Sequence, residues 1–117
     1  MVVDDSPTLR ALHRSVLENA GYLVVEAEDG GEALVALQQE PADVVITDIQ
    51  MPGMDGLTLI RRLREAAEWR RLPIIVVSQY GRKEDLQKAA AHGADRHVVK
   101  SSFDPQQFLE MVKGLVE

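Results

Sequence analysis

The segment VVITDIQMPGMDG, residues 44–56, begins as an apolar strand and ends in a turn rich in proline and glycine. Residues 44–46 are all β-branched, which favours an extended backbone in a buried sheet. This run leads directly to Asp48, and the Pro/Gly-rich loop at residues 51–56 then ends the extended segment. An acidic side chain is therefore expected at the carboxyl end of a strand that is otherwise apolar.

The same rhythm of apolar run, turn and amphipathic segment recurs along the whole chain. After the loop, for example, Leu57, Ile60 and Leu63 follow at helical spacing. Strands are predicted at Met1–Val3, Tyr22–Val25, Val44–Ile46, Ile74–Val77 and His97–Val99. Helices are predicted over residues 7–20, 32–40, 57–67 and 82–92, and from residue 105 onward.

Alternating strands and helices predict an α/β fold. The strands are almost continuously apolar, which indicates a parallel sheet with both faces covered. Right-handed crossovers make this a doubly wound, three-layer sandwich. With 117 residues and no internal repeat or linker, the chain fits a single domain. In such folds, ligands bind at the carboxyl ends of the strands.

Composition excludes several classes of protein. There is no cysteine, so disulfides and thiolate chemistry are absent, and the net charge of -6 argues against a general nucleic-acid binder. The basic stretch at residues 61–71 is interleaved with glutamates and predicts a solvated helix face. No apolar run approaches the length of a membrane span. We expect a cytoplasmic chain that binds neither nucleic acid nor membrane.

Polar side chains directly follow four of the predicted strands. We expect five of them to converge on one edge of the sheet: Asp4, Asp5, Asp48, Ser78 and Lys100. Three carboxylates together repel one another unless a cation lies among them, and Mg²⁺ suits a site that leaves room for water and phosphate. Lys100 and the Ser78 hydroxyl would complete a cradle for an anion. This combination suits phosphoryl transfer, with a carboxylate as nucleophile.

Several motifs together resemble the receiver domain of two-component response regulators, over essentially the whole chain. They are VVDDS at residues 2–6, VVITDIQMPGMDG at 44–56, Ser78, GAD at 93–95 and VVK at 98–100. The resemblance implies a flavodoxin-like (βα)5 sandwich with a five-stranded parallel sheet. It also implies a histidine kinase as phosphodonor, and an output partner protein that binds the face formed by the last strand and its flanking helices.

Individual roles follow from the resemblance. Asp48 is then the phosphoacceptor, Ser78 hydrogen-bonds a phosphoryl oxygen, and Lys100 pairs with the acylphosphate. The implied Mg²⁺ ligands are Asp4, Asp5, Asp48 and the backbone carbonyl of Gln50.

Three positions depart from the family pattern, although none removes a group of the predicted site. They are Gln79, where the family usually has a small residue, His97 in place of an aromatic residue, and Ser101 in place of proline. A cis peptide at Lys100–Ser101 is nevertheless expected, so that the lysine is aimed into the site, although cis costs about 2.5–4 kcal/mol without proline. His13, on the first helix, is expected at the surface.

The context of the domain has two interpretations. Residues 98–104 look most like those of receivers at the C-terminus of chemotaxis-type hybrid histidine kinases, and the short first strand suggests that the domain, residues 1–117, is cut from a longer chain. A free-standing regulator is the alternative.

Two other functions would require residues that this chain lacks. A small aspartyl-phosphate phosphohydrolase would need a second acid two residues after the nucleophile, where this chain has Gln50. A flavin or nucleotide binder would need a glycine-rich loop after the first strand, which is absent here. The isolated domain is therefore expected not to be an enzyme, apart from its own phosphorylation and autodephosphorylation.

Overall fold

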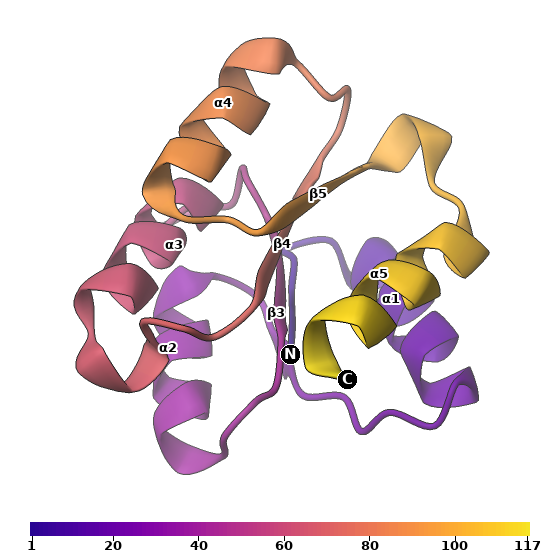
Figure 1. The fold of residues 1–117 in the computed structure, drawn as a ribbon, viewed down its shortest axis with the longest axis horizontal. Helices are drawn as coiled ribbons and strands as arrows, with labels where there is room; N and C mark the ends of the chain where they lie inside the picture. Colours follow the sequence, from indigo (N-terminus) through magenta and orange to yellow (C-terminus); the bar gives the residue numbers. More distant parts are fainter.

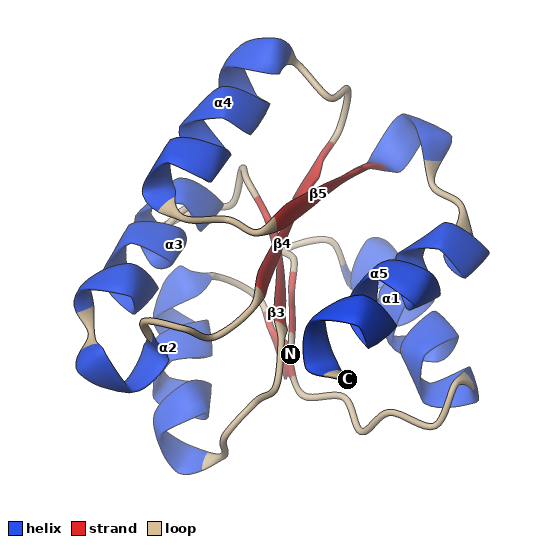
Figure 2. Ribbon diagram, in the orientation of Figure 1, coloured by secondary structure: helices blue, strands red, loops and turns tan.

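A computed structural model describes residues 1–117 as one five-stranded parallel sheet with helices on both faces (Figures 1 and 2). The strand order is β2-β1-β3-β4-β5. The strands are β1 (Val2–Val3), β2 (Glu26–Ala27), β3 (Val45–Asp48), β4 (Ile74–Ser78) and β5 (Arg96–Val99). The predicted α/β, doubly wound sandwich is confirmed.

Five α-helices follow the strands in alternation, and two short 3₁₀ turns complete the structure. The α-helices are α1 (Pro7–Asn19), α2 (Gly30–Gln39), α3 (Gly56–Glu65), α4 (Lys83–His92) and α5 (Pro105–Val116); the 3₁₀ turns are η1 (Ala67–Trp69) and η2 (Lys100–Ser102). Four α-helices begin at a side chain that accepts a hydrogen bond from a backbone N–H of the first turn, as helix N-caps do: Ser6, Asp29, Asp55 and Asp104.

The sheet separates two hydrophobic cores. Helices α2, α3 and α4 cover one face, where their apolar residues pack on Val45, Ile74 and Val76. Helices α1 and α5 cover the other face (Figure 1), against neighbouring strand residues such as Ile46 and Ile75. Successive residues of a strand point to opposite faces, so a strand buried on both sides must be apolar throughout.

The second strand was predicted at the wrong residues. The apolar run Tyr22–Val25 is not a strand, and β2 lies just after it. Val2 pairs with Glu26 and Val3 with Ala27, and Val25 O accepts from the backbone N–H of Val2 at 2.9 Å. Leu23, within the predicted strand, is 99% exposed.

His13 is buried, so its predicted surface position is wrong. It lies one helical turn before Leu17 on the inner face of α1, and its side chain contacts α5 and the loop before it. The ring centroid is 5.1 Å from that of Phe103 and 5.7 Å from that of Phe108. Burial lowers the pKa of His13, with a smaller opposing effect from Asp4.

Arg64 on α3 links several segments at the amino ends of β4 and β5. Its guanidinium donates to three backbone carbonyls and one carboxylate: Gly93 O at 3.0 Å, Trp69 O at 3.1 Å, Leu72 O at 2.7 Å and Asp95 Oδ2 at 3.0 Å. Asp95 also accepts from the backbone N–H of Ile74 at 2.8 Å. This arginine of the basic stretch is therefore a structural residue and not part of a solvated helix face.

Candidate functional site

Three carboxylates meet at the carboxyl ends of β1 and β3. One oxygen from each of Asp4, Asp5 and Asp48 lies within 4.8 Å of the others. Because β1 and β3 are neighbours in the sheet, residues that follow or end these strands are brought together. Asp4 and Asp48 are buried, whereas Asp5 is exposed.

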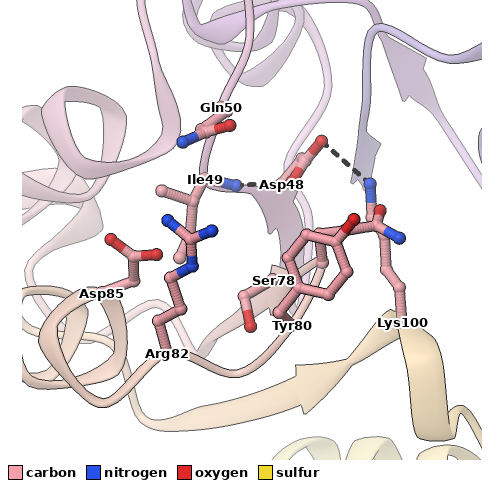
Figure 3. A pocket seen from close by; sticks show the side chains of 9 residues that line it. Asp48, Ile49, Gln50, Ser78, Tyr80, Arg82, Asp85 and Lys100 are labelled. Atoms are coloured by element: carbon pink, nitrogen blue, oxygen red, sulfur yellow. Dashed lines mark hydrogen bonds and ion pairs between the residues drawn. The ribbon is translucent and has the colours of Figure 1, made fainter.

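Lys100 connects the two buried carboxylates. Its Nζ donates to Asp48 Oδ2 at 3.0 Å (Figure 3). The same atom lies 3.5 Å from Asp4 Oδ2. The other oxygen of Asp48, Oδ1, accepts from the backbone N–H of Ile49 at 2.8 Å. Burial raises the pKa of Asp48 above its ordinary value, while the hydrogen bond and charge of Lys100 oppose that shift. The lysine thus favours the ionised form of a buried acid.

The backbone of Asp48 is fixed by the turn that follows β3. Gly56 N–H donates to Ile49 O at 2.8 Å, and a Cβ at Gly56 would lie only 2.0 Å from the Asp48 carbonyl oxygen. Only glycine permits this close approach. Asp55 caps α3 by accepting from Thr58 N–H at 2.8 Å. The sequence indicated the turn, but not that Gly56 packs against the Asp48 backbone.

Ser78 ends β4, the strand that neighbours β3 on the side away from β1. Its Oγ accepts from the backbone N–H of Gly81 at 3.0 Å and its hydroxyl proton remains available as a donor. Gly81 has φ +66°, and a Cβ there would lie 2.7 Å from a methyl carbon of Val99. The turn after β4 therefore contacts β5 directly.

Asp48, Ser78 and Lys100 line one open pocket of about 240 Å³. Gln50, the fourth residue predicted to contribute a metal ligand, lines it as well, as does Tyr80 (Figure 3). Sequence reasoning did not single out Arg82, which also lines the pocket, with its guanidinium carbon 5.8 Å from the centre of the Tyr80 ring. The structure brings all the predicted site residues to this edge of the sheet.

The peptide bond between Lys100 and Ser101 is trans, and no peptide bond in the chain is cis. The expected cis bond is therefore wrong. Lys100 still reaches Asp48, with its Nζ at 3.0 Å from Oδ2, and the chain turns into η2 at the lysine. A trans bond also avoids the cost of a cis peptide without proline.

The donor set fits a magnesium ion. Carboxylate oxygens on neighbouring strand ends are the hard ligands that Mg²⁺ binds, and few protein ligands leave coordination positions for water and phosphoryl oxygens. Asp4 and Asp48 offer buried carboxylates, and Asp5 offers an exposed one.

Comparison with known proteins identifies the family. The response regulator receiver domain model matches residues 1–113, so the chain belongs to that family. A gliding motility regulatory protein of Myxococcus xanthus is 36% identical over 115 residues. The match covers 98% of this chain but only 15% of that relative.

Solved structures agree with the family. The signal receiver domain of a signal transduction histidine kinase from Syntrophus aciditrophicus matches with a TM-score of 0.90 at 30% identity, covering 98% of this chain and 86% of that one. The chemotaxis protein CheY4 of Vibrio cholerae matches with a TM-score of 0.90 at 33% identity, covering 97% and 94%.

Membership defines the class of function. The chain is a phospho-accepting signalling switch of two-component systems and not a classical enzyme, so the phosphohydrolase alternative is not favoured. Receiver domains bind Mg²⁺ at an acidic pocket, and they interact with histidine kinases and output partners. None of the helices here has the length and apolarity needed to cross a membrane.

Proposed function

We propose that Asp48 accepts a phosphoryl group from the phosphohistidine of a histidine kinase. One observation carries this proposal: a buried carboxylate at the end of β3 faces an open pocket and is paired with the only lysine at the site, Lys100, at 3.0 Å. An ionised carboxylate is the nucleophile that this transfer needs, and the hydrogen bond and charge of Lys100 favour that form. Lys100 also provides a positive charge that can pair with the negative charge of the incoming phosphoryl group.

The transfer is a displacement at phosphorus. One oxygen of Asp48 forms the new O–P bond, and the P–N bond to the donor imidazole breaks with its electron pair remaining on nitrogen, which takes up a proton. Lys100 then pairs with the phosphoryl group, and the Ser78 hydroxyl donates to a phosphoryl oxygen. Both side chains already line the pocket that the phosphoryl group must enter.

Asp4, Asp5, Asp48 and the Gln50 carbonyl would hold Mg²⁺. When bound, Mg²⁺ neutralises charge on the phosphoryl oxygens during transfer. Lys100 Nζ lies between Asp4 and Asp48, at 3.5 and 3.0 Å, and it would pair with the phosphoryl group once that group is attached to Asp48.

The phosphorylated state is read, in our proposal, by an output protein that binds the face formed by α4, β5 and α5. The Gly81 turn supports this route, because it bonds to Ser78 Oγ and also contacts Val99 of β5. If Ser78 turns toward a phosphoryl oxygen, the turn shifts with it and changes the surface near His97, which is exposed on β5.

The context that we propose is a hybrid histidine kinase of the chemotaxis type. The likeness to the Syntrophus aciditrophicus receiver supports fusion to a kinase, and the sequence of residues 98–104 supports the chemotaxis type. A receiver meets its kinase in the cytoplasm, where we place this chain.

Phosphorylation by a small-molecule phosphodonor tests the proposal. The intact mass of the protein, measured with Mg²⁺ and with EDTA, should show a single phosphoryl adduct only when Mg²⁺ is present. Asp48→Asn should show none. An adduct of equal yield in Asp48→Asn, or one formed equally well in EDTA, would contradict the proposal.

A further inference from the structure

Arg10 on α1 lies against the turn that carries the acidic pair. Its side chain is only 14% exposed. Nη1 donates to the backbone carbonyl of Asp4 at 2.8 Å, and Nε donates to Glu26 Oε1 of β2 at 3.1 Å. A second acid, Glu28, lies 3.9 Å from Nη2. One guanidinium thus joins α1, β2 and the backbone of the predicted metal ligand.

We propose that Arg10 is a positioning residue for the magnesium site: it fixes the turn between β1 and α1 and so sets where Asp4 and Asp5 present their carboxylates. The inference rests on the proposed magnesium site. A guanidinium suits the role because its planar fork can donate to two acceptors in a fixed relative geometry.

The bonds of Asp4 form a closed arrangement with β2. Its N–H donates to Ala27 O at 3.1 Å, and its carbonyl is tied through Arg10 to Glu26, the residue before Ala27. Both backbone polar groups of Asp4 are therefore held by β2, one directly and one through Arg10. Its side chain is held separately, since Oδ1 accepts from Ser6 N–H at 2.9 Å.

The residues after Asp4 leave the sheet, since β1 ends at Val3 and α1 begins at Pro7. Asp5 is exposed, so its carboxylate depends on the backbone of this turn for its position. Magnesium demands near-octahedral geometry with short bonds, and it tolerates displaced ligands poorly.

Arg14 offers a matched control. It also pairs with Glu26, and with Glu18 at 3.0 Å, but its hydrogen bonds do not include Asp4. Removing either arginine takes one positive charge from the same cluster. If charge alone mattered, both losses would slightly strengthen Mg²⁺ binding. A positioning role predicts that only the loss of Arg10 weakens it.

Isothermal titration of the metal-free chain with MgCl₂ tests the inference. We expect Arg10→Ala to bind Mg²⁺ about tenfold more weakly, at the low end for residues that orient metal ligands. Arg10→Lys keeps the charge but cannot bridge both acceptors, so most of the loss should remain. Arg14→Ala should stay within about twofold of the unaltered chain. Melting curves in EDTA check that each variant is folded. If Arg10→Ala is not folded, the titration of Arg10→Lys provides the test.

The outcomes distinguish the role of Arg10 from the magnesium site itself. The positioning role would be overturned if the affinity for Mg²⁺ were unchanged in both Arg10→Lys and Arg10→Ala. It would also be overturned if Arg10→Ala and Arg14→Ala changed that affinity equally. Either result would leave the magnesium site itself intact. Absence of Mg²⁺ binding by the unaltered chain would instead overturn the proposed site, and this inference with it.

Discussion

Replacement of Arg64 by alanine should destabilise the fold without removing the chemistry of the site. The side chain donates hydrogen bonds to Gly93, Trp69, Leu72 and Asp95, and joins α3 to the amino ends of β4 and β5. Its aliphatic part also packs over Gly93, where a Cβ would lie 2.7 Å from Arg64 Cγ.

The structure sets the magnitude. Four hydrogen bonds at about 1 kcal/mol each give an upper value of about 4 kcal/mol. The Arg64 side chain is 19% exposed, so water can satisfy part of the acceptors after its removal. We therefore expect a loss of about 2–3 kcal/mol in the free energy of unfolding. For a domain of this size, that lowers the Tm by roughly 10 °C.

Thermal and urea unfolding, followed by circular dichroism, measure this loss. Arg61→Ala is the matched control on the same helix: Arg61 is 57% exposed and lies 4.0 Å from Glu65, a pair worth about 0–0.5 kcal/mol. Phosphorylation of Arg64→Ala at low temperature should be retained, since Arg64 lies at the opposite ends of the strands from Asp48. A loss equal to that of Arg61→Ala within about 0.5 kcal/mol would refute the reasoning.

Three further predictions concern residues near the site. The folded-state pKa of His13 lies below its ordinary 6.5, so the stability that its neutral form contributes is lost as the pH falls from 6.5 through that pKa. The Tm of His13→Leu should therefore rise relative to that of the unaltered chain between pH 7 and pH 5, and a constant difference between the two Tm values would contradict this. Tyr80 is 68% exposed and lines the pocket, where its ring shields the phosphoryl group and offers no carboxylate to orient an attacking water. Phospho-Asp48 should therefore decay severalfold faster in Tyr80→Glu after the donor is removed, and equal or slower decay would refute the shielding role. Gly56→Ala should lower both the Tm and the yield of phosphorylation, because its Cβ would meet the Asp48 carbonyl. Gly114→Ala on α5, where a Cβ would meet open space, should lower neither, and equal behaviour of the two variants would contradict the close approach.

Much of the site could be predicted because strand ends are visible in the sequence. The apolar runs before Asp48 and Ser78 stop at those residues, and parallel strands bring their carboxyl ends to one edge. The position of β2 could not be predicted in the same way. The run at residues 22–25 has the composition of a strand, but the residues that pair with β1 are Glu26 and Ala27, directly after it.

Side-chain identity misled the prediction where tertiary contacts decide. His13 is polar, yet its place on the inner face of α1 buries it against two phenylalanine rings. Arg64 was predicted on a solvated helix face, because only the folded chain shows which carbonyls it reaches. The 3₁₀ turn at Lys100–Ser102, which contains the trans bond after Lys100, was likewise not indicated by any local motif.

The central claim is that Asp48 itself carries the phosphoryl group, and chemical trapping tests it most directly. The chain is phosphorylated by a small-molecule donor in the presence of Mg²⁺, reduced with borohydride, digested and mapped by mass spectrometry. Reduction converts an aspartyl phosphate to homoserine, and we predict homoserine at residue 48 alone. Homoserine at Asp4, Asp5 or any other aspartate, with residue 48 unchanged, would contradict the account.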